Sequence, residues 1–221
     1  MSLFILGILL AVFLTFVAIG LNTYRVNWGH RWLNCATGWV YLFCYTYHRL
    51  SRNQLQLPET GPAILAANHV SGLDPLLMMC ISPRPVRFLI AREVYDRFWL
   101  NWIVKAMGAI PVDRAGRPEK ALRQAIVALQ KGEVIGIFPH GKIITANDNR
   151  ENIKSGAIRL AQLSECAIYP IHFYGMKFEG SEFLSLLFRA KAKAVFHEPI
   201  SGGSTQTEHA QSDLIRKMNS A

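Results

Sequence analysis

The sequence is poor in charged residues and in cysteine. Only 18% of its 221 residues are charged and 51% are hydrophobic, a composition that is apolar for a soluble enzyme. The few cysteines show no close-paired spacing, which argues against a zinc knuckle and a disulfide framework, so we expect them to be reduced and buried. They are Cys35, Cys44, Cys80 and Cys166. The length allows one α/β domain with an appendage, and hardly two full domains.

The first apolar stretch lacks charge altogether. Residues 2–21, SLFILGILLAVFLTFVAIGL, contain no charged side chain and are long enough to span the core of a bilayer. A secretory signal peptide would need a basic region before the apolar run and a small-residue cleavage site after it. Only Met1 and Ser2 precede the run and no A-x-A follows it. We therefore expect a retained membrane anchor.

Acidic residues are absent from the next segment, between Asn22 and Pro58. Four arginines lie there, and the whole chain has a net charge of +9. Positive flanks stay on the cytoplasmic side of a membrane, so we expect everything after the anchor to be cytoplasmic. The basic charge favours a surface of anionic lipid headgroups, because no nucleic-acid-binding motif accompanies it.

A second uncharged run covers residues 32–47, WLNCATGWVYLFCYTY. It is short for a membrane span, and its Trp and Tyr residues prefer the membrane interface. One interpretation is an interfacial helix that pairs with the first one, and the other is an ordinary buried helix of the domain. We expect a membrane anchor over residues 1–50, with a transmembrane helix at 2–21 and an interfacial helix at 32–47, followed by a domain over residues 51–221.

From Gly61 onward, short apolar runs alternate with helical patterns. The apolar runs predict strands at 62–68, 86–91, 109–112, 134–139, 167–173 and 192–198. The helical patterns predict helices at roughly 75–82, 97–107, 119–131, 154–164 and 208–219. This alternation predicts an α/β fold with a mixed, mostly parallel sheet covered by helices on both faces.

Polar residues follow three of the predicted strands. Asn68 and His69 end the first strand, PVDR (111–114) ends the third, and FPHGK (138–142) ends the fourth. Ligands of open α/β sheets bind beyond the carboxyl ends of the strands, so these clusters are expected to meet at one edge. Asp74 has a structural interpretation as well, since Asp followed by Pro is a strong helix start with Asp as the N-cap.

These residues carry a resemblance. NHVSGLD (68–74) resembles the NHx4D motif of the glycerolipid acyltransferase family, which contains the 1-acylglycerol-3-phosphate acyltransferases. GAIPVDR (108–114), IFPHGK (137–142) and IYPIHF (168–173) are similar to that family's second, third and fourth blocks, and IKSGAIRLA (153–161) is similar to its basic helix. The likeness covers roughly residues 60–175, in the same order and spacing.

The resemblance implies a membrane-bound enzyme that moves a fatty acyl group from a thioester to a lysophospholipid hydroxyl. The expected acceptor is 1-acyl-sn-glycerol-3-phosphate, the donor is acyl-CoA or acyl carrier protein, and no further cofactor is expected. His69 is expected to be the general base and Asp74 the group that fixes its tautomer. Arg114 matches the arginine expected to hold the acceptor phosphate, and Lys154 is its expected helper. The other expected substrate-binding residues are Asn68, Ser71, His140, Gly141 and Lys142.

The third block departs from the family pattern. His140 stands where Glu is expected, and Lys142 and Ile143 replace a Thr-Arg pair. If the acceptor still carries a phosphate, we expect a protonated His140 to donate to it. The departure leaves two alternatives open, a different lysolipid acceptor or a catalytically silent lipid-binding homologue. A metal-dependent hydrolase using His69, Asp74, His140 and His172 is a further alternative, although the spacing matches no metal motif.

Overall fold

The computed structural model describes residues 2–114, 116, 118–145, 147–203 and 207–220. Its centre is a six-stranded sheet with the order β3-β2-β4-β1-β5-β6. The strands are β1 (Ala63–Ala67), β2 (Val86–Ala91), β3 (Ile110–Val112), β4 (Val134–Ile137), β5 (Ile168–Tyr174) and β6 (Lys193–Phe196). Neighbouring strands are parallel except for β6, which is antiparallel to β5. The predicted mixed, mostly parallel sheet is confirmed.

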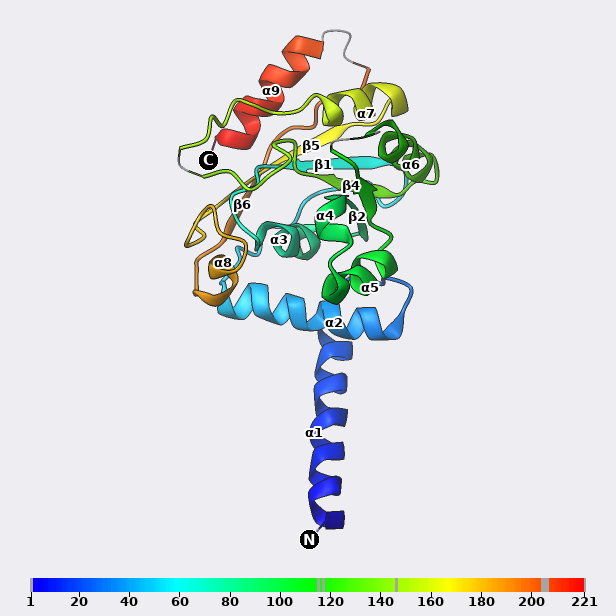
Figure 1. The fold of residues 1–221 in the computed structure, drawn as a ribbon, viewed down its shortest axis with the longest axis vertical. Coiled ribbons are helices and arrows are strands. Elements are labelled where there is room, and N and C mark those ends of the chain that lie inside the picture. The colour runs from blue at the N-terminus through cyan, green and yellow to red at the C-terminus, as the bar shows by residue number, and fades with distance from the viewer. Residues whose placement is uncertain (1, 115, 117, 146, 204–206, 221) are drawn as a thin grey trace.

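Helices cover both faces of this sheet (Figure 1). The helices of the described residues are α1 (Ser2–Thr23), α2 (Arg31–Leu42), the π-helix η1 (Phe43–Tyr47), α3 (Asp74–Ile81), α4 (Arg92–Tyr95), α5 (Phe98–Ala106), α6 (Pro118–Gln130), α7 (Gly156–Ser164), α8 (Leu184–Leu187) and α9 (Thr207–Asn219). The helical patterns did not predict α4 and α8. Each has four residues, about one turn, which is too short to show a helical period.

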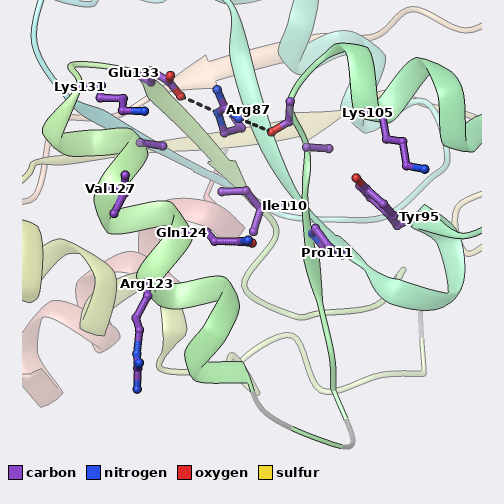
Figure 2. A pocket seen from close by; sticks show the side chains of 13 residues that line it. Arg87, Tyr95, Lys105, Ile110, Pro111, Arg123, Gln124, Val127, Lys131 and Glu133 are labelled. Carbon is purple, nitrogen blue, oxygen red and sulfur yellow. Dashed lines mark hydrogen bonds and ion pairs between the residues drawn. The ribbon is translucent and has the colours of Figure 1, made fainter.

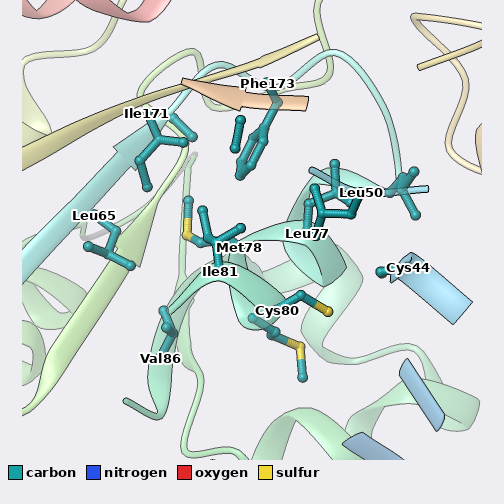
Figure 3. Close-up of a cluster of buried hydrophobic side chains, with 14 of the residues drawn as sticks. Cys44, Leu50, Leu65, Leu77, Met78, Cys80, Ile81, Val86, Ile171 and Phe173 are labelled. Carbon is teal, nitrogen blue, oxygen red and sulfur yellow. The ribbon is translucent and has the colours of Figure 1, made fainter. Parts of the chain in front are cut away.

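The central strand β1 separates two hydrophobic cores. All five of its residues are buried, as expected for a strand covered on both faces. Ala63, Leu65 and Ala67 face a cluster with α3 and the α2–η1 segment (Figure 3). Ile64 and Ala66 face the second cluster, which contains residues of α6, α7 and α9. Cys44, Cys80 and Cys166 are free and buried, as expected, whereas the burial predicted for Cys35 is wrong because its free thiol is only half-buried.

Helix α1 is long and apolar and leads away from the rest of the protein (Figure 1). An 18-residue window within Leu3–Thr23 has a mean hydropathy of 2.9, with 6% of that window buried, and the stretch is long enough to cross a membrane. It crosses α2 closely, because a Cβ atom on Gly38 would lie only 1.9 Å from the carbonyl oxygen of Gly20. Trp39 Nε1 also donates to the carbonyl oxygen of Phe16, at 3.2 Å. Small residues at the crossing thus join α1 to the domain.

The second apolar run lies between α1 and the domain. Its Tyr41 and Cys44 belong to the same buried cluster as α3. The hydroxyl of Tyr47 donates to the carbonyl oxygen of Leu187 in α8, at 2.6 Å. Trp32 and Tyr47 nevertheless remain exposed. The segment therefore has one face packed in the core and aromatic side chains at the surface.

Candidate active site

His69 and Asp74 are paired at the carboxyl end of β1. His69 follows the strand and Asp74 begins α3, and His69 Nδ1 lies 3.0 Å from Asp74 Oδ2. A carboxylate only accepts hydrogen bonds, so Nδ1 carries the imidazole proton. The lone pair of the neutral ring is then on Nε2, as a general base requires.

The Asp74 carboxylate is fully buried and held by several donors. The backbone N–H groups of Val70 and Ser71 donate to Oδ2 at 2.7 and 2.8 Å, and the Ser71 hydroxyl donates to Oδ1 at 2.7 Å. The prediction that Asp74 caps α3 is wrong, because the N-cap is Leu73 and no side chain caps the helix. Both carboxylate oxygens accept instead from the loop that precedes the helix. That loop folds back over Asp74 and so places His69 against it.

Phe138 packs against the imidazole ring of His69. The two rings stack with centroids 4.3 Å apart and an interplanar angle of 23°. An aromatic face next to His69 favours the imidazolium form once the ring has accepted a proton. The backbone N–H of Ile144 donates to the carbonyl oxygen of His69 at 2.7 Å, which ties the loop after β4 to the His69 loop. Sequence reasoning did not single out Phe138, although it lies in the quoted FPHGK stretch.

His140 is buried and does not present a positive charge to the site. Its Nε2 lies 3.1 Å from the carbonyl oxygen of Arg150 and donates to it. Burial holds the pKa of His140 below its ordinary value, and the hydrogen bond to the Arg150 carbonyl offsets only part of this lowering. The ring is therefore neutral near pH 7, with a buried Nδ1 that has no partner among the described residues. This geometry disagrees with the expected donation from a protonated His140 to a phosphate.

Gly141 and Lys154 lie together next to His140. Gly141 has a φ of +71°, a conformation that favours glycine. A Cβ atom on Gly141 would lie 3.0 Å from Lys154 Cε, so the lysine side chain covers this turn. Lys142 points instead to Asp148, with which it forms an ion pair.

The remaining predicted site residues lie apart from this group or serve the fold. Arg114 is exposed in the loop after β3, and strands β2 and β4 separate β3 from β1 in the sheet. Asn68 is buried, and its side chain both donates to and accepts from the backbone of Phe173, at 2.8 and 2.7 Å. It thereby joins the carboxyl ends of β1 and β5. Ser71 contacts Asp74 as described above.

A cavity of about 580 Å³ opens elsewhere, along β3 and α6 (Figure 2). Arg87, Lys105, Arg123 and Lys131 contribute positive charge to its lining, and Arg87 is paired with Glu133. None of the predicted site residues lines this cavity. The cavity and the His69–Asp74 pair are therefore separate features of the structure, and the side chain of His69 is 17% exposed.

The described residues gather no group of three or more His, Cys, Asp or Glu side chains suited to a metal ion. His172 lies in β5, where its Nδ1 pairs with the carbonyl oxygen of Met218 in α9. It is a packed residue on the α9 side of the sheet, and it does not join His69 and Asp74.

The acyltransferase family matches residues 48–174, more than half of the chain and the whole region that contains His69, Asp74 and His140. The chain belongs to this acyltransferase family. The match begins in the segment after η1 and ends with β5, so α1, α2 and α9 lie outside it.

Individual relatives agree with this assignment. The chain is 27% identical over 149 residues to the 1-acyl-sn-glycerol-3-phosphate acyltransferase of Bacillus subtilis (strain 168), a match that covers 67% of this chain and 71% of the relative. The enzyme of the same name from Borreliella burgdorferi is 28% identical over 120 residues, which cover 53% of this chain but 48% of the relative. The chain thus spans about half the length of that second relative.

A solved structure shares the fold. The 1-acyl-sn-glycerophosphate acyltransferase PlsC from Thermotoga maritima superimposes with a TM-score of 0.62 over 84% of this chain and 79% of its own. The sequence identity is 17%, so this likeness concerns the fold alone.

Proposed function

We propose that this acyltransferase moves a fatty acyl group from a thioester to the free hydroxyl of 1-acyl-sn-glycerol-3-phosphate, giving phosphatidic acid. The observation that carries the proposal is the His69–Asp74 pair, with its fixed tautomer and an Nε2 that is left to act as a base. The names of the bacterial relatives support the choice of acceptor. The donor is acyl-CoA or an acyl carrier protein.

The reaction proceeds by direct transfer. His69 Nε2 takes the proton of the acceptor hydroxyl while that oxygen attacks the thioester carbonyl carbon. The tetrahedral intermediate collapses, the C–S bond breaks, and the imidazolium returns its proton to the leaving thiolate. Asp74 and Phe138 stabilise the imidazolium between these two proton transfers. Base catalysis of this kind contributes roughly 10²–10⁴-fold in rate.

Lys154, at the turn after β4, and Arg114, in the loop after β3, are the proposed contacts for the acceptor phosphate. Lys154 covers the turn at Gly141, and a lysine there acts as a flexible point charge. Arg114, which matches the arginine of the second family block, is proposed to supply a bidentate contact. Asn68 and Ser71 support this region through the fold.

The third family block, residues 137–142, favours an alternative acceptor. His140 is neutral and Lys142 is neutralised by Asp148, so two of the expected positive contacts are missing. A lysolipid with another headgroup is therefore the second candidate acceptor.

We place the enzyme at a membrane, with α1 as a single transmembrane anchor and the remaining chain on the cytoplasmic side. The apolar length of α1 and the four arginines between Asn22 and Pro58 support this arrangement.

An acyl-transfer assay tests the proposal. The purified full-length protein is supplied with acyl-CoA or acyl carrier protein and with lysophosphatidic acid or lysolipids of other headgroups. The product is then identified by mass spectrometry. Phosphatidic acid as the main product supports the first candidate, and preference for another lysolipid supports the second. Absence of transfer with every pair, by a folded protein, would show a silent lipid-binding homologue.

A further inference from the structure

Exposed apolar side chains gather on two short elements that lie outside the catalytic pair. In α5, Phe98, Trp99 and Trp102 are 89%, 47% and 56% exposed. The segment around α8, residues 178–188, has a second group, made of Phe178, Phe183, Leu184, Leu187 and Phe188. Large apolar side chains that remain exposed in contiguous groups mark an interaction surface.

Both groups adjoin the α2–η1 segment, which follows α1 in the chain (Figure 1). Trp102 of α5 contacts Trp32 of α2, with ring centroids 5.2 Å apart. On the α8 side, the hydroxyl of Tyr47 donates to the carbonyl oxygen of Leu187. The exposed apolar surface is therefore continuous with the segment that carries the membrane anchor.

The α8 segment also adjoins the loop between His69 and Asp74. The backbone N–H of Gly180 donates to the carbonyl oxygen of Val70 at 2.7 Å, and that of Gly72 donates to Ser181 at 3.2 Å. The approach is close, because a Cβ atom on Gly72 would lie 1.9 Å from the carbonyl oxygen of Glu182. The α8 segment thus rests directly on the loop between His69 and Asp74.

An ion pair connects α5 to the α8 segment. Arg97, which precedes α5, lies 2.9 Å from Glu182. Glu179 pairs in turn with Arg150. The stretch from Lys177 to Lys193 contains four basic residues, and its acidic residues are Glu179 and Glu182. With both acids paired to arginine, the surface is basic around an apolar centre, which suits anionic lipid headgroups.

We propose that α5 and the α8 segment dock into the surface layer of the bilayer that α1 enters, and that a lysolipid passes between them from this layer to His69. This inference rests on the proposed function only for the identity of the lipid that passes. The occupant of the surface is the lipid bilayer itself, since the surface continues an apolar anchor and is bordered by basic side chains.

Depth-sensitive labelling of the full-length protein tests the docking. All variants carry Cys35→Ser, which removes the half-buried thiol that could react with the label. The other three cysteines are buried. An environment-sensitive fluorophore is attached after Phe98→Cys, Leu187→Cys or the control Leu163→Cys. Leu163 is 56% exposed on α7, at the far side of the sheet from α2. Vesicles of phosphatidylcholine with a minority of phosphatidylglycerol contain lipids with a nitroxide on the acyl chain.

The expected result is strong nitroxide quenching at positions 98 and 187 and little at position 163. Equal quenching at all three positions would overturn the proposal. So would emission changes at 98 and 187 that depend on protein concentration in detergent and not on vesicles, since a second copy of the chain would then cover the surface. Quenching does not require catalysis. A protein that docks but transfers no acyl group would therefore contradict the proposed function and leave the docking proposal standing.

An activity measurement tests the passage of the lipid. The double variant Phe98→Ser with Leu187→Ser should transfer to vesicle-borne acceptor at least about fivefold more slowly than Leu163→Ser, because its surface loses apolar contact with the bilayer. Transfer to a short-chain acceptor dissolved as monomers should stay within about twofold of wild type, since the base and its carboxylate are untouched. Equal losses with both acceptors would overturn the proposal in favour of a structural role.

Discussion

Asp74 holds His69 from inside the protein. The two residues are five positions apart, and a fully buried carboxylate accepts from the imidazole Nδ1 at 3.0 Å while three donors of the intervening loop hold the carboxylate itself. The orientation of His69, the proposed base, is thus set by a short loop at the end of β1. Changes to this loop should affect stability and activity together.

Asp74→Asn should lower both the rate of acyl transfer and the stability. One of the two oxygens becomes an NH₂ group, which cannot accept from the N–H and O–H groups that face the carboxylate. We expect a rate loss of roughly 10²-fold or more and a loss of unfolding free energy of about 1–3 kcal/mol. Steady-state transfer and thermal unfolding in detergent measure the two effects. The matched control is Asp213→Asn on the surface of α9, which should change neither by much. Wild-type rates in Asp74→Asn would show that the carboxylate does not orient the base.

Ser71→Ala tests the second carboxylate oxygen. The variant removes the donor to Oδ1 while the His69 contact to Oδ2 remains. A buried acceptor without its donor costs about 1–3 kcal/mol, so the melting temperature should fall, with a smaller loss of rate than in Asp74→Asn. Ser155→Ala, at an exposed serine that makes no capping hydrogen bond, is the control. Unchanged melting temperatures in both variants would contradict the described network.

The buried His140 should make stability depend on pH. Its pKa in the folded protein lies below the ordinary value of 6.5, so unfolding takes up a proton when the pH is below about 6.5. The folded protein is therefore fully stabilised above that pH and loses stability as the pH falls toward the lowered pKa. His140→Gln, which keeps a donor for the Arg150 carbonyl, should flatten this slope. His48 and His197, whose pKa values are also lowered by burial, contribute equally to both proteins. Identical slopes of melting temperature against pH would show that folding does not lower the pKa of His140.

Deletion of residues 1–21 should weaken membrane association without abolishing it. The aromatic residues of the α2–η1 segment and the arginines around it remain, and electrostatic binding to anionic vesicles should fall as salt is added. Vesicle sedimentation at low and high salt measures this effect, with the substitutions Arg25→Gln and Arg31→Gln in the truncated protein as a test of the charge. Complete release at low salt would show that residues 32–47 only pack in the protein core and do not bind the membrane.

Most strands and long helices followed from the sequence, whereas the details of the site did not. The apolar run 86–91 coincides with β2, because a strand of a parallel sheet that is covered on both faces shows a short continuous apolar run in the sequence. Asp-Pro predicted a helix start correctly, since Pro75 sits in the first turn of α3, but not the direction in which the carboxylate bonds. That direction depends on a loop conformation. The burial of His140 depends on a carbonyl group ten residues later, and the position of α8 depends on its contacts with the catalytic loop. Such tertiary contacts leave no periodic pattern in a sequence.

The central claim is that His69 is the base of an acyl transfer to a lysolipid hydroxyl, and the most direct measurement is the turnover of His69→Ala. The purified full-length variant is compared with wild type and with His209→Ala, an exposed histidine of α9, using lysophosphatidic acid and a thioester donor. We predict a loss of ~10²–10⁴-fold in turnover for His69→Ala, with unchanged folding and membrane association, and wild-type turnover for His209→Ala. Wild-type turnover by His69→Ala would contradict the account.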